Sequence, residues 1–172
     1  IYYKGEEILQ IKIKDFQFYE FLKNYHEKDN KHNQKADLVG DEDVISILDR
    51  QQRMTSLYLA LNGSYAKKIP YYRWDSPHAF PKKKLYLNIL KKSDDIELEY
   101  DFRFLSDNEA KNDENNFWFP VSKVMDFTDS PQVMNYVIEN ELMNTSKYTS
   151  EQSYFATSSL SKLQNAIHQK GN

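Results

Sequence analysis

The chain contains no cysteine among its 172 residues. This absence excludes disulfide bonds, thiolate catalysis and zinc sites built on Cys ligands. Glycine is also scarce, at four residues, so a glycine-rich phosphate loop or a dinucleotide fingerprint has no room in the sequence. The four histidines are scattered without the spacing of a transition-metal site. The common cofactor and metal motifs are therefore missing.

Long apolar runs are missing as well. No stretch approaches the roughly 20 apolar residues of a membrane-spanning helix, and no signal-peptide pattern opens the chain. A cytoplasmic protein with no membrane partner is the simplest interpretation. The net charge of −3 argues against a strongly basic nucleic-acid module, although it leaves room for a local basic patch. The first residue is Ile1 rather than Met, which indicates a fragment of a longer protein.

What is present is typical of one globular domain. Hydrophobic residues make up 40% and charged residues 28% of the chain, and a chain of this length can bury a sizeable core. The 13 Tyr and 10 Phe residues are expected mainly in the core and at its rim. Only four arginines stand among the 23 basic residues, and two of them lie in one octapeptide.

Apolar periodicity predicts an α+β fold, with strands mostly first and helices last. In the strand expected at 96–105, the residues at 97, 99, 101 and 103 are acidic or basic and the even-numbered ones are apolar, so the apolar side should face the core. The expected strands are Ile8–Ile13, Val44–Leu48, Leu85–Leu90 and Ile96–Leu105. The expected helices are Phe16–His26 after an Asp15 cap, Gln52 to Asn62-Gly63, Val121–Phe127, Pro131–Met143, and a last one from Ser150 or Ser153 to Gln169. The alternation in Phe16-Gln17-Phe18 also permits a strand there.

The connection Tyr65–Lys84 is long, irregular and holds three of the five prolines. A loop of this length is usually functional or held by aromatic packing. Lys82-Lys83-Lys84, with Arg73, Trp74 and two tyrosines nearby, is compatible with a DNA-backbone patch with stacking aromatics. The simpler interpretation is a solvated loop before a strand. The other expected connections are an exposed loop at Glu27–Asp43, a hairpin turn at Lys91–Asp95 and a polar spacer at Ser106–Asn116.

The densest polar cluster is Asp49-Arg50-Gln51-Gln52-Arg53-Met54-Thr55-Ser56, between an expected strand and an expected helix. A helix N-terminus offers free N–H groups and a positive dipole end, so it suits an anion. Arg53 can grip a phosphate with two hydrogen bonds, and Thr55 and Ser56 add hydroxyl groups.

The remaining members of the octapeptide suit hydrolytic chemistry. Asp49 can hold a metal or orient a water, while Gln51 and Gln52 can position a water or a nucleotide edge. The alternative is purely structural: Asp49 and Arg53 are four residues apart and can form an ion pair, or Asp49 serves only as an N-cap.

Asp-Arg-Gln-Gln-Arg-Met-Thr-Ser-Leu-Tyr at 49–58 resembles the Asp-Gly-Gln-Gln-Arg-Leu-Thr-Ser/Thr-Leu-Tyr signature of the GmrSD-type restriction endonuclease N-terminal domain family. The resemblance extends over residues 16–127, through the segments 18–22, 84–90, 100–105 and 118–121. It implies a ParB/sulfiredoxin-like fold, in which a small mixed sheet surrounds a strand–motif–helix core and C-terminal helices follow. The domain would occupy residues 1–130, with 131–172 as its helical extension.

The same resemblance implies a function in bacterial restriction or phage defence, through nucleotide binding and hydrolysis or DNA nicking. The catalytic residues would be Asp49, Gln52 and Arg53, with Asp49 as the Mg²⁺ ligand. The phosphate and nucleotide contacts would come from Arg50, Gln51, Arg53, Thr55 and Ser56. The implied cofactors are Mg²⁺ and a nucleoside triphosphate, and the implied partners are DNA and a C-terminal His-Asn-His nuclease domain, which this chain does not contain.

Two departures from the family pattern leave an alternative open. Arg50 occupies the position of the family glycine, which permits close approach of backbone to phosphate. Its guanidinium can add a phosphate contact, or the substitution marks a catalytically degenerate binding or assembly module of a larger DNA-processing protein. The family's Gln-Arg-x-Tyr/Phe segment has no match in Ile1–Asp15. Half of the expected pocket is missing if the intact protein lacks this segment, and a matching segment upstream of Ile1 would complete it. A ParB-like DNA-binding protein is a third possibility, disfavoured by the net acidity.

Overall fold

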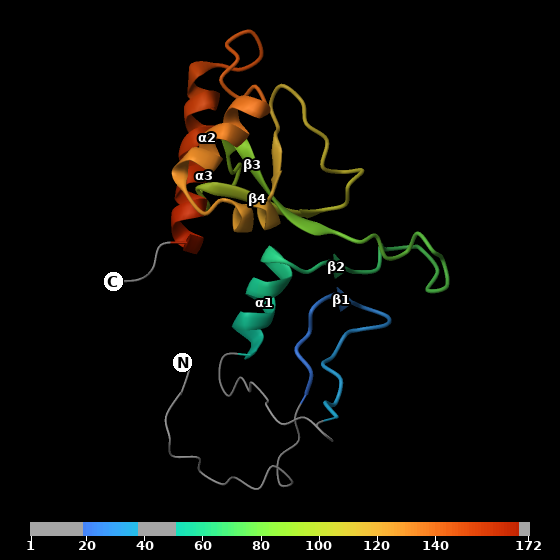
Figure 1. Ribbon diagram of the computed structural model, residues 1–172. Coiled ribbons are helices and arrows are strands. Elements are labelled where there is room, and N and C mark those ends of the chain that lie inside the picture. The colour runs from blue at the N-terminus through green and yellow to red at the C-terminus, as the bar shows by residue number, and fades with distance from the viewer. Residues whose placement is uncertain (1–18, 38–50, 169–172) are drawn as a thin grey trace, which may run out of the picture.

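The computed structural model describes residues 19–37 and 51–168, and these form the α+β arrangement shown in Figure 1. A sheet with its helices occupies one end of the molecule, and helix α1 with two short strands occupies the other. The strands expected at Ile8–Ile13 and Val44–Leu48 lie outside the described residues, as do Phe16-Gln17-Phe18. The α+β class is confirmed by small parallel and antiparallel sheets followed by C-terminal helices.

The larger sheet has three antiparallel strands in the order β4-β3-β5. Its central strand β3 (Lys84–Lys92) is buried continuously from 86 to 90, because neighbouring strands and a helix cover it. The flanking strands are β4 (Tyr100–Leu105) and β5 (Trp118–Pro120). The structure thus confirms the strand expected at 85–90 and the polar spacer expected at 106–116. Most of the aromatic segment Phe117-Trp118-Phe119-Pro120 forms the strand β5.

Three helical segments follow the sheet in the order expected from the sequence. They are the 3₁₀ helix η2 (Val121–Asp126), α2 (Ser130–Glu139) and α3 (Ser150–His168). Helix α2 starts with a capping box between Asp129 and Gln132. The cap of α3 is Thr149 rather than Ser150 or Ser153, since the Thr149 hydroxyl accepts from the Gln152 N–H and the Gln152 side chain accepts from the Thr149 N–H.

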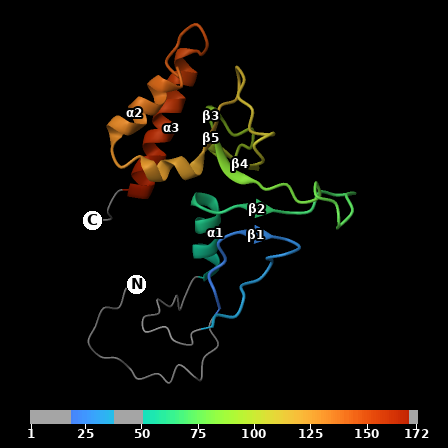
Figure 2. The ribbon, with the colours of Figure 1, turned by 45° about the vertical axis from the view of Figure 1, so that its right-hand side comes forward.

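The hydrophobic core lies between the sheet and these helices. Figure 2 shows the sheet and the helices from a second direction. Phe119 is fully buried and its ring meets Phe127 at 5.7 Å and Tyr136 at 5.2 Å. Burial raises the pKa of Tyr136 to about 12. The buried core residues are Leu87, Ile89, Leu90, Phe117, Phe119, Val121, Val124, Phe127, Val133, Val137, Leu142, Ala156 and Leu160.

Helix α1 (Gln51–Leu61) matches the helix expected from Gln52 to Asn62-Gly63. The N–H groups of Asn62 and Gly63 both donate to the carbonyl of Tyr58, which ends the helix at the predicted Asn-Gly pair. The last residue of α1, Leu61, packs against the core. Beside α1, strand β1 (Tyr25–His26) pairs in parallel with β2 (Tyr65–Ala66).

Two predictions about this architecture are wrong. Residues 19–26 do not form the expected helix, because Tyr25 joins β2: its ring stacks on Tyr65 at 5.0 Å and its N–H donates to the Ser64 carbonyl. The strand expected at Ile96–Leu105 starts only at Tyr100. Its apolar side is also not the core side, since Phe102 and Phe104 are exposed whereas Asp101 is buried.

Candidate functional site

The start of helix α1 carries the described part of the predicted motif. The side chains of Gln52, Arg53 and Ser56 are exposed there. Residues of an α-helix follow one another at about 100°, so these three lie within one sector of about 100°. The structure therefore brings Gln52 and Arg53 together on an open side of the first helical turn. Asp49 and Arg50 lie outside the described residues, and Gln51 is described only as the first residue of the helix.

Thr55 does not belong to this group. It lies about 200° around the helix from Arg53 and is half-buried. The Ser56 hydroxyl also has a local role, because it donates to the Gln52 carbonyl at 2.9 Å. The hydroxyl groups of Thr55 and Ser56 therefore add few hydrogen bonds to a phosphate that is bound by Arg53.

The position of Arg53 is unfavourable for the helix itself. Its positive charge stands in the first turn, where the helix dipole is positive too, and no acidic residue accompanies it in that turn. Within the described part of the chain, Arg53 makes no ion pair. An arginine in this place does not stabilise α1, whereas an anion bound there would offset both the dipole and the side-chain charge.

A pocket of about 540 Å³ lies next to α1, inside the loop that precedes it. One wall includes Phe21, whose ring meets Tyr58 of α1 edge-on at 5.3 Å. Within α1, Tyr58 follows Arg53 by five residues, which corresponds to about 7.5 Å along the helix axis. The two limbs of the loop are joined by bonds from the Glu20 N–H to the Gln34 carbonyl and from the Asn33 amide to the Glu20 carbonyl. The pocket is lined by Glu20, Phe21, Leu22, Lys23, Asn24, Asn30, Asn33 and Gln34.

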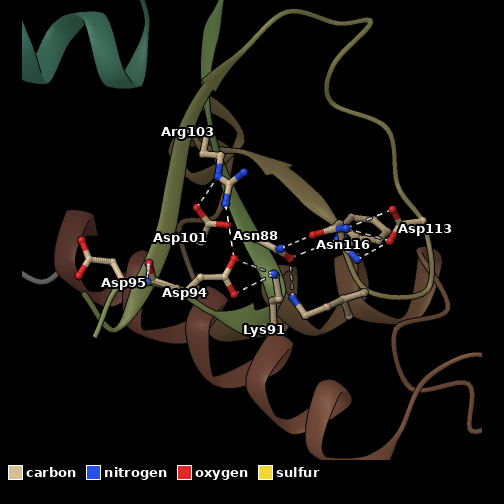
Figure 3. Close-up of polar contacts among 11 residues, drawn as sticks. Asn88, Lys91, Asp94, Asp95, Asp101, Arg103, Asp113 and Asn116 are labelled. Atoms are coloured by element: carbon tan, nitrogen blue, oxygen red, sulfur yellow. Dashed lines mark hydrogen bonds and ion pairs between the residues drawn. The ribbon is translucent and has the colours of Figure 1, made fainter. Parts of the chain in front are cut away.

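A second polar cluster, drawn in Figure 3, escaped prediction. Asn88 of β3 is fully buried, and its side-chain oxygen accepts from the N–H groups of Leu90 at 3.1 Å and Phe117 at 3.3 Å. Its amide donates to Asn116 at 2.9 Å, and the Asn116 amide donates to the Asp113 carboxylate. The only signal in the sequence is an Asn inside the apolar run Leu-Tyr-Leu-Asn-Ile-Leu.

The other half of this cluster surrounds Arg103 of β4. Its Nε donates to the buried Asp101 carboxylate at 2.7 Å, and its guanidinium lies 4.0 Å from Asp94. The same guanidinium lies over the ring of Trp118, 5.4 Å from the centroid. The bond to Asp101 raises the pKa of Arg103. The second oxygen of Asp101 is buried and has no hydrogen-bond partner among the residues that the structure describes. Asp94 also pairs with Lys91 at 3.1 Å.

We interpret this cluster as structural support for the sheet. The pairing between β3 and β4 is irregular between Leu87 and Lys92, so backbone groups there lose their ladder partners. The side-chain oxygen of Asn88 replaces one of these lost partners, because it accepts a hydrogen bond from the Leu90 N–H. The backbone N–H of Asn115 and the side-chain amide of Asn116 hold the pKa of Asp113 below its usual range, which keeps the outer end of the cluster charged.

No three His, Asp or Glu side chains within residues 19–37 and 51–168 come together in a way that could hold a metal ion. The expected Mg²⁺ ligand, Asp49, lies outside those ranges. No helix in the described part of the chain has the length and apolar character needed to cross a bilayer.

No protein-family model matches the chain, and no curated protein matches its sequence.

Proposed function

We propose that this chain is a nucleotide- or DNA-processing domain of a bacterial restriction or phage-defence protein, and that it binds phosphate at the start of α1. The observation that carries the proposal is the exposed guanidinium of Arg53, which has no ion-pair partner among the described residues and stands at the positive end of a helix. The resemblance of residues 49–58 to the restriction-endonuclease signature supports it. A cytoplasmic place of action belongs to the same proposal.

The proposed roles follow from side-chain chemistry. Arg53 neutralises charge on the phosphate, and Gln52, on the same side of α1, positions a water for attack. Arg50 and Gln51 would extend the phosphate site toward the strand expected before it. Thr55 and Ser56 would contribute little to this site, because Thr55 faces away from Arg53, the Ser56 hydroxyl is used within the helix, and both residues lie beyond the four free N–H groups at the start of α1.

The described residues fit a phosphate better than they fit a metal cage, because the first turn of α1 contains a guanidinium and no carboxylate. Mg²⁺ in nucleotide sites is commonly held by one or two carboxylates together with phosphate oxygens and water. Asp49 would be the carboxylate here. The ion would supply further charge neutralisation, while Arg53 and Gln52 would bind and orient the reacting groups.

The test is Mg²⁺-dependent hydrolysis of nucleoside triphosphates, and nicking of plasmid DNA, by the intact protein and its Arg53→Ala variant. A charge-assisted hydrogen bond of roughly 1.5–3 kcal/mol corresponds to a loss of about 10- to 150-fold in kcat/KM. Lys111→Ala is a matched control, since it removes one exposed positive charge from the distant polar loop. Equal activity of Arg53→Ala and the parent protein would remove Arg53 from the mechanism.

The second candidate is a catalytically degenerate binding or assembly module. Arg50 in place of the family glycine favours it, because a side chain there opposes close approach of the backbone to phosphate. Calorimetric titration of nucleotide into the parent protein and Arg50→Gly separates the two candidates. A gain of nucleotide binding in Arg50→Gly marks a degenerate enzyme. No gain, in a stably folded protein without hydrolytic activity, supports the binding-module candidate.

A further inference from the structure

Residues 65–84, which run from β2 to the first residue of β3 and which we call the basic arm, project away from the rest of the molecule in both views (Figures 1 and 2). Its ends are held together, because Tyr65 and Lys83 exchange two backbone hydrogen bonds of 2.9 Å each. The arm therefore leaves and rejoins the fold at one place, like a hairpin without regular strands along its length.

The arm has a defined internal structure. The N–H of Ile69 donates to the carbonyl of Ala79 at 2.8 Å, and Ala79 is fully buried. Phe80 packs against Trp74 at 5.5 Å and against His26 at 4.8 Å. The sequence left open whether this connection is functional or held by aromatic packing, and the packing is now evident. This packing covers the ring of Phe80, but other aromatic rings of the arm remain exposed to solvent.

Tyr71 is the most conspicuous of these rings. Its side chain is fully exposed, its φ is +69°, and it takes part in no ring contact within the described residues. Positive φ is uncommon for a bulky residue, so the turn holds this ring outward at some cost in backbone strain. Tyr72 and Trp74 are each about half exposed. Large rings of this kind normally bury their surface against a partner.

The charge of the arm is opposite to that of the whole chain. It holds six Lys or Arg side chains and one carboxylate, while the chain has a net charge of −3. Lys67, Lys82 and Lys84 are exposed and make no ion pair within the described residues. The ammonium of Lys68 lies over the Trp74 ring, 5.5 Å from its centroid, which places a cation beside an exposed aromatic surface.

Nearby carboxylates reduce this positive charge without cancelling it. Asp75 pairs with Arg73 at 3.3 Å, and Glu109 pairs with Lys83 at 3.0 Å. Glu27 accepts the backbone N–H of Lys68 at 2.7 Å. Three acidic groups therefore face six basic ones, and the three free lysines remain available to an anionic partner.

We propose that the basic arm binds single-stranded DNA, with Tyr71 and Trp74 stacking on bases and Lys67, Lys82 and Lys84 contacting phosphates. Exposed rings next to flexible cations suit unpaired bases, whose faces are accessible, and the pattern needs no base-specific hydrogen bonds. The arm presents neither a helix nor a regular two-stranded ribbon that would enter the major groove of a duplex. The choice of DNA rests on the proposed function, whereas the surface itself is independent of Arg53.

The test is fluorescence anisotropy of a labelled 20-nucleotide oligo(dT) titrated with the intact protein. We expect Tyr71→Ala to weaken binding about 10-fold and Tyr71→Phe, which keeps the ring, to restore the parent affinity. Tyr154→Ala is the matched control, because Tyr154 is an exposed tyrosine on α3. The triple variant Lys67→Ala/Lys82→Ala/Lys84→Ala should reduce the slope of log Kd against log salt by about 2, as expected for three lost phosphate contacts on a single strand.

Several outcomes would overturn the proposal. They are no binding of the oligonucleotide by the parent protein, equal binding by Tyr71→Ala, or tighter binding of a duplex or of the matching RNA. Arg53→Ala separates this proposal from the hydrolytic one. If Arg53→Ala loses hydrolysis but keeps its affinity for the oligonucleotide, both proposals are supported. If the parent protein hydrolyses nucleotide but does not bind the oligonucleotide, only the proposal about the basic arm is overturned.

Discussion

Residues 84–168 and the described residues before them are held together in different ways. Every member of the hydrophobic core cluster lies between Leu87 and Leu160. Among the described residues before β3, the buried apolar ones are only Leu22, Ala66 and Ala79. The earlier part relies instead on backbone hydrogen bonds and stacked rings, such as Tyr25 on Tyr65, and meets the core through Leu61 at the end of α1.

This difference bears on function. Arg53, the pocket beside α1 and the basic arm all belong to the sparsely packed part, whereas the polar cluster of the C-terminal part, around Asn88 and Arg103, supports the sheet. Regions with few buried contacts open at lower free energy than a packed core. Binding surfaces that must reach a ligand are commonly drawn from such regions and positioned by a rigid scaffold. The C-terminal part is the scaffold in this interpretation.

The largest effect is expected when the buried amide of the scaffold is removed. Asn88→Ala leaves the N–H groups of Leu90 and Phe117 without their acceptor, in a fully buried place. Each unsatisfied buried group costs about 1–3 kcal/mol, so the loss of both acceptor contacts should lower the free energy of unfolding by roughly 2–6 kcal/mol. Urea denaturation measures this change. Asn115→Ala, which alters an exposed amide in the adjoining loop, should stay within about 0.5 kcal/mol of the parent. A parent-like midpoint for Asn88→Ala would contradict the structural role.

A smaller and more local effect is expected at the junction of α1 with the preceding loop. A Cβ at position 63 would lie 2.5 Å from the Lys23 carbonyl oxygen and 2.8 Å from the Cα of Leu59, so Gly63→Ala forces the two segments apart. Such overpacking costs about 1–3 kcal/mol. Hydrogen exchange should accelerate at the Tyr25 N–H, which donates to Ser64, and not at the Ile89 N–H, which donates to Phe117.

The control for this substitution is Asn62→Ala, which changes the exposed neighbouring residue. It should leave both exchange rates unchanged. Equal acceleration of hydrogen exchange at Tyr25 and Ile89 in Gly63→Ala would mean that the part before β3 and residues 84–168 open as one unit. That result would contradict the proposed difference in stability between these two parts.

The smallest effect is expected from protonation of Asp113 at the rim of the scaffold. Its pKa is lowered in the fold by the Asn115 N–H and the Asn116 amide, so the unfolded chain takes up its proton at a higher pH. The stabilisation from Asp113 is therefore present above the unfolded pKa of about 4 and is lost as pH falls through the folded value. Chemical denaturation from pH 7 to pH 2 should show the advantage of the parent over Asp113→Asn shrinking below about pH 4. A constant difference between the two proteins would refute the assignment.

Local sequence signals predicted most of the helices and the central strand. The apolar run at 85–90 predicted β3, Asn62-Gly63 predicted the end of α1, and Ser130-Pro131 predicted the start of α2. These signals depend on residues close together in the chain, such as a cap or a stretch that can be buried on both faces. The positions of Gln52 and Arg53 near the start of α1 follow from the same local signals.

Long-range contacts decided the remainder. Alternation in 96–105 placed Phe102 and Phe104 in the core, but the irregular pairing with β3 buries Asp101 and leaves both rings exposed. The pairing of Tyr25 with Tyr65 overrode the helix expected at 16–26. Neither outcome can be read from a short window, since each depends on which distant strand lies alongside.

The sequence by itself determined that this is an α+β chain without cysteine, with a basic, aromatic connection and an arginine in the first turn of a helix. The tertiary structure alone decided that Tyr25 pairs with Tyr65, that Asn88 supports the sheet from within, and that Tyr71 is held outward on an arm. The physical reason is that caps, turns and apolar runs act within a few residues, whereas burial and the satisfaction of polar groups depend on the neighbours that folding brings together.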